Sequence, residues 1–218
     1  MAESLREARA LGHVRRLGVY GGSFDPVHLG HLHVARVAQR AFALEHVVFV
    51  PAAEPPHKPG RKLASREDRV RMLELALADE PRWSISTLEF ERAGPSFTVD
   101  TLRALPQRLA LAPEAELYLL IGWDNLRGLE RWRSVRELLA LAQLVVVWRA
   151  GADEGLLDSL RRELGPELYA NIARGLVREP PAPESSTELR ATLARGGEPL
   201  DALPAGVLEY IRSRGIYR

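Results

Sequence analysis

A short segment near the N-terminus combines glycines, a hydroxyl, a carboxylate and two histidines. Residues 21–31 read Gly-Gly-Ser-Phe-Asp-Pro-Val-His-Leu-Gly-His. They join an apolar run at 17–20 to a helical pattern at 32–38, which predicts a strand, a glycine turn and a helix whose first turn carries His28 and His31. Amides at a helix start are unpaired and lie at the positive end of the helix dipole, so this junction favours an anion such as phosphate. The pattern is typical of a nucleotide site.

The two histidines admit three interpretations. His28 and His31 are three residues apart, so both imidazoles lie on one helix face and can reach the same anion. A metal site would add Asp25 and His33, but on a helix His33 points well away from the other two. A capping or core role would need no ligand. We favour phosphate because the glycine turn lets the backbone come close to a ligand.

The rest of the chain alternates apolar runs of β type with helical periodicity. Residues 1–16 are charged and helix-prone, and we interpret them as an exposed N-terminal extension that precedes one domain at 17–218. Continuous valine runs indicate strands covered on both faces. The chain is therefore predicted to be α/β, with a single Rossmann-like, doubly wound parallel sheet, helices on both faces, and the ligand beyond the carboxyl ends of the strands. The expected strands are 17–21, 46–50, 83–87, 116–121, 143–148 and 172–178, and the expected helices are 29–43, 65–79, 98–105, 133–141, 155–164, 187–195 and 204–214.

The composition fits one soluble globular domain. The chain has 218 residues, of which 46% are hydrophobic and 27% charged. A formal net charge of +1 gives no overall field for nucleic acid or a membrane, so any anion-binding charge must be local. Cysteine is absent, which excludes disulfides and thiolate catalysis and fits a cytoplasmic protein, and no apolar stretch reaches the roughly 18 residues of a membrane span. We expect no nucleic-acid or membrane partner, and a homo-oligomer remains open.

Two further segments carry groups that suit phosphate. Prolines on both sides of His57 and Lys58 stiffen that loop, which as a plain loop needs no ligand but would hold both side chains at a strand end. The residues Ser-Ser-Thr at 185–187 precede the apolar positions of a helix, where capping explains one hydroxyl. Three hydroxyls followed by Arg190 indicate a second phosphate site, since a guanidinium can bind two phosphate oxygens at once.

Two more segments have a plain structural interpretation. Gly122 and Asp124 follow the strand expected at 116–121, where Asp124 can cap a helix. Trp132 can be a core residue.

Together these segments resemble the bacterial nicotinate-nucleotide adenylyltransferases, of the nucleotidyltransferase superfamily that shares its fold with class I aminoacyl-tRNA synthetases. The resemblance extends over about residues 17–218 and keeps the order of the motifs. One position departs: Glu184 stands where the family usually has isoleucine before Ser-Ser-Thr. The motifs are the segment at 21–31, Pro-Pro-His-Lys-Pro at 55–59, Arg-Met-Leu-Glu-Leu-Ala at 71–76, Pro-Ser-Phe-Thr-Val-Asp-Thr-Leu at 95–102, Ile-Gly-Trp-Asp-Asn-Leu at 121–126, Arg-Trp at 131–132, Ser-Ser-Thr-Glu-Leu-Arg at 185–190 and the ending from Tyr210 to Arg218.

The resemblance implies that a nucleotidyltransferase domain at 17–218 transfers the adenylyl group of ATP to nicotinate mononucleotide in NAD biosynthesis. The products would be nicotinate adenine dinucleotide and pyrophosphate, with Mg²⁺ bound mainly through the ATP phosphates and no metal site of the protein's own. It implies catalytic roles for His28, His31 and Arg190. The implied ATP-binding residues are Gly21, Gly22, Ser23, Phe24, His28, Gly30, His31, Gly122, Asp124, Ser186, Thr187 and Arg190. The implied nicotinate mononucleotide-binding residues are His57, Lys58, Thr98, Val99, Trp132 and Arg133, with the pyridine ring on Trp132 and its carboxylate at the backbone near Thr98 and Arg133.

Two alternatives stay open. One is a related transferase that acts on nicotinamide mononucleotide, phosphopantetheine or a cytidylyl acceptor. The other is a nucleotide-sensing or RNA-binding module without catalysis, but the near-neutral charge argues against RNA and the full set of phosphate-type residues argues against a dead sensor. Product analysis with ATP and each acceptor separates these alternatives.

Overall fold

A six-stranded sheet forms the centre of the molecule, in a computed structural model that describes residues 10–55, 62–148, 154–179 and 185–218. The strand order is β3-β2-β1-β4-β5-β6 and every neighbouring pair is parallel. The predicted fold class is therefore confirmed. The strands are β1 (Arg16–Gly22), β2 (His46–Pro51), β3 (Trp83–Ile85), β4 (Glu116–Gly122), β5 (Gln143–Val147) and β6 (Leu176–Val177).

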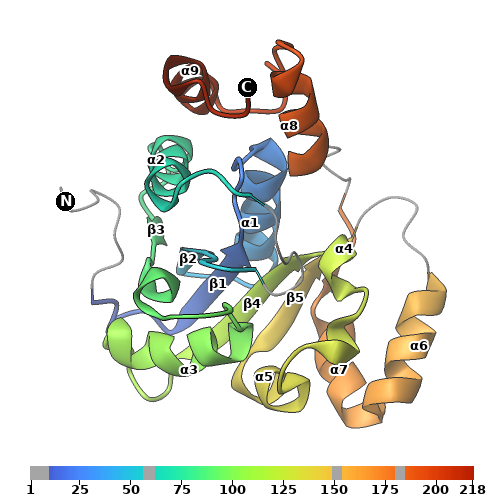
Figure 1. Cartoon of the computed structure of the whole chain (residues 1–218). Helices are drawn as coiled ribbons and strands as arrows, with labels where there is room; N and C mark the ends of the chain where they lie inside the picture. The colour runs from blue at the N-terminus through green and yellow to red at the C-terminus, as the bar shows by residue number, and fades with distance from the viewer. Residues whose placement is uncertain (1–9, 56–61, 149–153, 180–184) are drawn as a thin grey trace.

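Helices cover both faces of this sheet (Figure 1). One face carries α1 (Leu29–Ala41), α2 (Arg66–Ala76), α8 (Ser186–Ala194) and α9 (Ala205–Arg214). The other carries α3 (Thr98–Arg108), α4 (Trp123–Leu126), α5 (Val135–Leu141), α6 (Glu154–Leu164) and α7 (Pro166–Arg174). Two short 3-10 helices, η1 (Leu88–Glu91) and η2 (Leu129–Arg131), complete the described elements.

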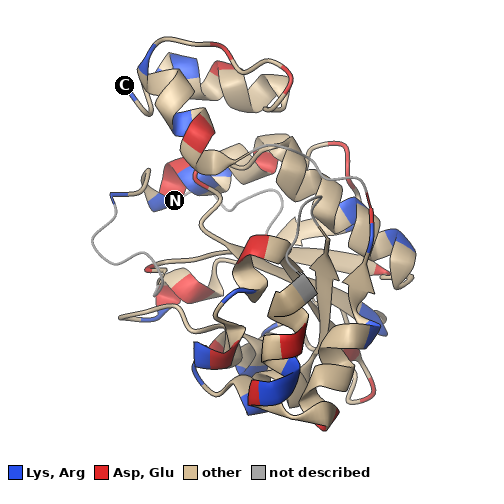
Figure 2. Cartoon of the chain, turned by 90° about the vertical axis from the view of Figure 1, so that its right-hand side faces the viewer, with Lys and Arg blue, Asp and Glu red and all other residues tan. Residues whose placement is uncertain are grey.

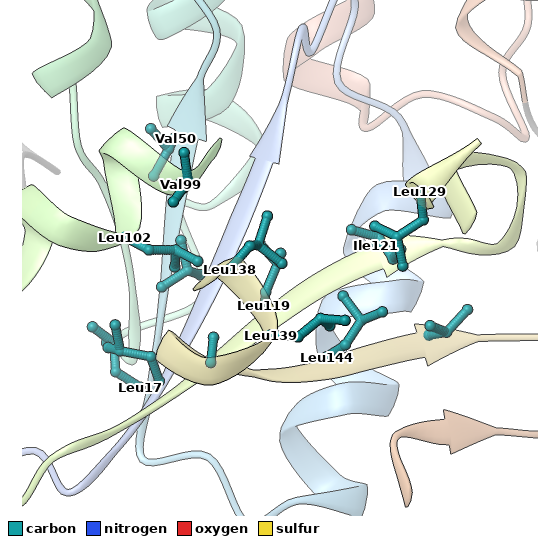
Figure 3. Close-up of a cluster of buried hydrophobic side chains, with 14 of the residues drawn as sticks. Leu17, Val50, Val99, Leu102, Leu119, Ile121, Leu129, Leu138, Leu139 and Leu144 are labelled. Atoms are coloured by element: carbon teal, nitrogen blue, oxygen red, sulfur yellow. The ribbon is translucent and has the colours of Figure 1, made fainter. Parts of the chain in front are cut away.

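Each face of the sheet has its own hydrophobic cluster because side chains alternate along a strand. In β2, Val48 and Val50 belong to the cluster beneath α3 and α5, whereas Val47 and Phe49 belong to the cluster beneath α1 and α2. Figure 3 shows the first cluster, in which helical leucines pack onto strand leucines. Strands buried on both faces explain the continuous apolar runs of the sequence.

The strand order reverses between β1 and β4, and this reversal places the site. β3 and β2 lie on one side of β1, while β5 and β6 lie beyond β4. In open α/β sheets such a reversal leaves a crevice outside the carboxyl ends of the two central strands. Gly22 and Gly122 end these two strands, so the loops that follow them form the walls of the crevice.

The strand expected at 172–178 is mostly wrong. Only Leu176 and Val177 pair with β5, and the residues before them form the end of α7. Pro166 starts α7 at a position where a missing N–H costs nothing. Asn171 then holds the helix, because its side-chain amide donates to the carbonyls of Leu139 and Ala142. The sequence pattern also did not predict α4, η1 and η2.

Two residues in the described part of the N-terminal segment are packed into the core, although their neighbours are exposed. Leu11 and Val14 are 8% and 1% exposed and join the cluster beneath α3. The Leu11 N–H donates to the Leu109 carbonyl at 2.7 Å. The expected exposure of this segment is therefore wrong for these residues, although the division of the chain at residue 16 stays a prediction.

Acidic and basic residues are interspersed along the helices that Figure 2 shows, in keeping with the net charge of +1. Within the described ranges, no helix combines the length and the apolar character that a membrane span requires.

Candidate active site

A cleft of about 580 Å³ lies at the carboxyl ends of β1 and β4. Its walls come from the β1–α1 turn, the loop after β2, the residues around η1 and η2, and the starts of α3 and α8. The cleft brings together residues that are far apart in the chain. Of the predicted site residues, those that line it are Gly21, Gly22, Ser23, His31, Thr98, Trp132, Arg133 and Ser186.

The two glycines of the turn have different roles. A Cβ at Gly21 would meet no atom within 4 Å, so the space in front of this residue is open to a ligand. A Cβ at Gly22 would lie 3.1 Å from the ring of Phe24, which is fully buried. The Phe24 side chain therefore packs in the core behind the turn, and only its backbone is available to a nucleotide.

The first turn of α1 fixes the orientation of His31. His28 is the N-cap of α1, and its backbone N–H donates to Nδ1 of His31 at 3.3 Å. A ring nitrogen that accepts carries no proton, so neutral His31 is protonated at Nε2. Because His31 lines the cleft, this turn holds an imidazole whose Nε2–H can donate to an anion.

His28 lies behind His31. His28 is 6% exposed, and the centroids of the His28 and His31 rings are 3.7 Å apart. Burial lowers the pKa of His28 to about 4, so its ring is neutral at pH 7. The structure thus brings the two predicted histidines together, with His31 at the cleft and His28 as a buried neighbour.

The start of α8 is tied to the β1–α1 turn. Nη1 of Arg190 donates to the backbone oxygen of Asp25 at 2.6 Å, and Nη2 donates to Oγ1 of Thr187 at 3.1 Å. The Ser186 hydroxyl donates to the Pro26 carbonyl at 3.2 Å. The two predicted phosphate segments therefore meet, although only Ser186 of this group lines the cleft.

Three residues at the far end of the cleft come from α3 and the segment after η2. Thr98 begins α3, whose N-cap Phe97 makes no side-chain capping bond. Val99 is 1% exposed, so only its backbone can reach a ligand. Trp132 is half-buried and Arg133 is exposed. The guanidinium carbon of Arg133 lies 4.5 Å from the centroid of the Phe97 ring.

Several residues of the site were missed by the sequence interpretation. Glu89 lines the cleft although it is 6% exposed, and it accepts from the Thr101 hydroxyl at 2.5 Å. Nothing in the mixed polar and apolar segment around Glu89 signals this role. Ser96 and Asn125 also line the cleft, and both stand inside motifs that the family resemblance had marked.

A buried arginine holds the loops of the site. Arg69 is 1% exposed and donates to the backbone oxygens of Ser23, Ala52 and Ala64 at 3.0, 2.7 and 3.3 Å. Burial lowers the pKa of its guanidinium, while the nearby carboxylate of Asp25 acts in the opposite direction. Arg69 therefore joins the loops after β1 and β2 to the segment before α2.

The remaining predicted site residues do not line the cleft or lie outside the described residues. Gly30 is buried within α1, while Gly122 and Asp124 lie at the β4–α4 junction beside Asn125 without lining the cleft. His57, Lys58 and Glu184 lie outside the described residues. Across the ranges that the structure describes, no three His, Asp or Glu side chains are grouped as metal ligands.

Comparisons with known proteins show the family to which the chain is similar. Residues 19–192 match the family described as cytidylyltransferase-like. The chain is 40% identical over 205 residues to a probable nicotinate-nucleotide adenylyltransferase of Desulfitobacterium hafniense (strain Y51), covering 94% of this chain and 96% of the relative. It is 39% identical over 203 residues to another in Synechococcus sp. (strain JA-3-3Ab), covering 93% and 95%.

A solved structure with 18% identity shares the fold, with a TM-score of 0.69 over 93% of this chain and 97% of the other. It is the nicotinic acid mononucleotide adenylyltransferase of Plasmodium falciparum in complex with NaAD. The family match and the relatives at about 40% identity confirm the resemblance noted in the sequence. This chain belongs to the cytidylyltransferase-like nucleotidyltransferases and, among them, to the nicotinate-nucleotide adenylyltransferases.

Proposed function

We propose that this enzyme transfers the adenylyl group of ATP to nicotinate mononucleotide, giving nicotinate adenine dinucleotide and pyrophosphate. The relatives at about 40% identity support the reaction. One structural observation supports the place where it occurs: His31 lines the cleft beside the open glycine turn, with its Nδ1 engaged by the His28 N–H at the start of α1. A helix dipole and an imidazole donor at one point, beside a turn with room for a ligand, favour a polyphosphate.

The chemistry needs positioning more than proton transfer. The phosphate of nicotinate mononucleotide is ionised at pH 7, so it attacks without a strong general base. One of its oxygens bonds to the α-phosphorus of ATP as the bond to pyrophosphate breaks, and the leaving group takes the electron pair. Bringing two polyanions together can supply roughly 7–11 kcal/mol in favourable cases. His31 and the amides of the turn donate to the charge that develops, and we assign Arg190 and His28 supporting roles.

Magnesium is expected to arrive with ATP. The groups that line the cleft at the turn and at the start of α8 are amide and imidazole N–H donors and the hydroxyls of Ser23 and Ser186, which suit phosphate oxygens better than a cation; the Asp25 carboxylate is buried behind them. An ion held by phosphates and water therefore fits this site, and its chemistry is to offset negative charge on the phosphates.

We place the acceptor nucleotide at the other end of the cleft. Its pyridine ring would stack on Trp132 and its carboxylate would meet the amides of Thr98 and Val99 at the start of α3, near the cation of Arg133. We retain His57 and Lys58 as proposed contacts of the phosphates.

Product analysis tests this function. Purified protein with MgATP and nicotinate mononucleotide should release pyrophosphate and form nicotinate adenine dinucleotide in equal amounts, as chromatography of the products would show. Parallel reactions with nicotinamide mononucleotide, with phosphopantetheine and with CTP plus a cytidylyl acceptor should be slower. Faster turnover of any of these would overturn the assignment of the substrate.

A further inference from the structure

The last residues of the chain reach the turn that we assign to phosphate. The Tyr217 hydroxyl donates to Oδ1 of Asp25 at 2.7 Å, across 192 positions of the sequence. In Figure 1 the C-terminus lies beside α8 and α9, on the face that carries α1. We infer that Tyr217 is a positioning residue, which holds the β1–α1 turn in the form that binds the phosphates of ATP.

Tyr217 restrains the β1–α1 turn through its hydrogen bond to Asp25. Asp25 is fully buried in the turn, three positions before His28, and its Oδ1 also accepts from the Ala64 N–H at 3.0 Å. Its backbone oxygen accepts from Arg190, and Nη1 of Arg190 lies 3.9 Å from Oδ2. A shift of Asp25 would therefore move the turn and Arg190 together.

Burial, a hydrogen bond and packing fix the Tyr217 side chain beside Asp25. Burial raises the pKa of its hydroxyl, and the hydrogen bond to Asp25 raises it further, so the hydroxyl stays protonated and donates throughout the neutral range. The backbone φ of Tyr217 is 68°, in the left-handed region, which a residue other than glycine adopts only when its surroundings hold it there. The side chain also packs against the cluster beneath α1 and α2.

This role predicts a selective defect. Without the hydroxyl, the buried carboxylate loses a donor and the turn loses a restraint, so ATP phosphates bind and react less well. The acceptor end of the cleft, around Trp132 and Thr98, makes no contact with Tyr217 among those described. The inference rests on the proposed function, because the turn matters only if ATP phosphates bind there.

The test compares Tyr217→Phe with Tyr210→Phe. Tyr210 is a matched control: it belongs to the same C-terminal region and its hydroxyl also donates to a carboxylate, Oδ1 of Asp68, at 2.8 Å. Each variant is assayed for kcat, for KM of ATP and of nicotinate mononucleotide, for thermal stability, and for MgATP binding by calorimetry without acceptor. Tyr217→Phe should lower kcat/KM for ATP about tenfold or more and leave KM for nicotinate mononucleotide within about twofold. Tyr210→Phe should leave all three kinetic constants within about twofold.

Equal losses in the two variants, or a Tyr217→Phe enzyme with normal ATP kinetics, would overturn the inference. If Tyr217→Phe folds poorly, Asp25→Asn addresses the same contact from the turn and must show the same loss confined to ATP. The failure of the proposed function is distinguishable from that of the inference. A wild-type protein that binds MgATP but forms no dinucleotide contradicts the proposed reaction, and the calorimetric Kd of the two tyrosine variants then decides the inference. A wild-type protein that binds no MgATP contradicts both.

Discussion

Replacement of His31 by alanine is expected to separate catalysis from folding. The substitution removes Nε2–H from the cleft and leaves the backbone of α1 intact. Loss of one oriented donor to a developing charge commonly costs about 10²–10³ in kcat, or about 2.7–4 kcal/mol. The structural loss is smaller, because His31 is half-buried and its Nδ1 makes one long capping bond, 3.3 Å from the His28 nitrogen. A cap of this kind contributes about 1 kcal/mol to stability.

Release of pyrophosphate under saturating substrates is the assay, with thermal unfolding of the same samples. His33→Ala is the matched control, because His33 is half-buried on the same helix two positions later and does not line the cleft. We expect His31→Ala to lose at least about 10²-fold in kcat and His33→Ala to stay within about twofold. A folded His31→Ala enzyme within about fivefold of the wild-type kcat would refute the role of this imidazole.

Three further predictions concern the acceptor, the loops and pH. Trp132→Ala should raise KM for nicotinate mononucleotide about tenfold and leave KM for ATP unchanged, since stacking adds roughly 0.5–1.5 kcal/mol. Trp132→Phe, which keeps an aromatic ring, should change KM for nicotinate mononucleotide by no more than about threefold. Equal effects in the two variants would count against stacking. Arg69→Met leaves three carbonyl groups without their buried donor. The free energy of unfolding, measured in urea, should therefore fall by about 3 kcal/mol or more. A loss below about 1 kcal/mol would contradict this prediction. Burial lowers the pKa of His28 from 6.5 to about 4, so the unfolded chain binds this proton more tightly and stability falls as the pH drops from 6.5 toward 4. His28 alone should account for about 2 kcal/mol of this loss between about pH 6.5 and 4.5, and urea titrations should show a flatter dependence for His28→Asn.

Local patterns predicted most of the sheet because its strands are buried on both faces. The runs around Val48 and Val145 have no polar residues to interrupt them, and they became β2 and β5. The segment at 172–178 misled the prediction because its few apolar residues fit a helix end as well as a strand. Tertiary contacts decided this case, because the Asn171 side chain in α7 donates to the carbonyls of Leu139 and Ala142 just before β5.

The site was predictable where one motif makes a whole structural unit. The segment at 21–31 contains the strand end, the turn and the helix start, so its geometry follows from local rules. Glu89 and Arg69 could not be found in this way, because their roles depend on loops that meet only in the folded chain. Tyr217 stood in a motif of the family, yet no local rule relates it to Asp25.

The place where ATP binds is the central claim. A crystal structure with a non-hydrolysable ATP analogue and Mg²⁺ tests it most directly. The account predicts phosphate oxygens within hydrogen-bond distance of His31 Nε2 and of the backbone amides after Gly21. A nucleotide whose phosphates lie away from this turn, with no oxygen of the analogue within hydrogen-bond distance of His31, would contradict it.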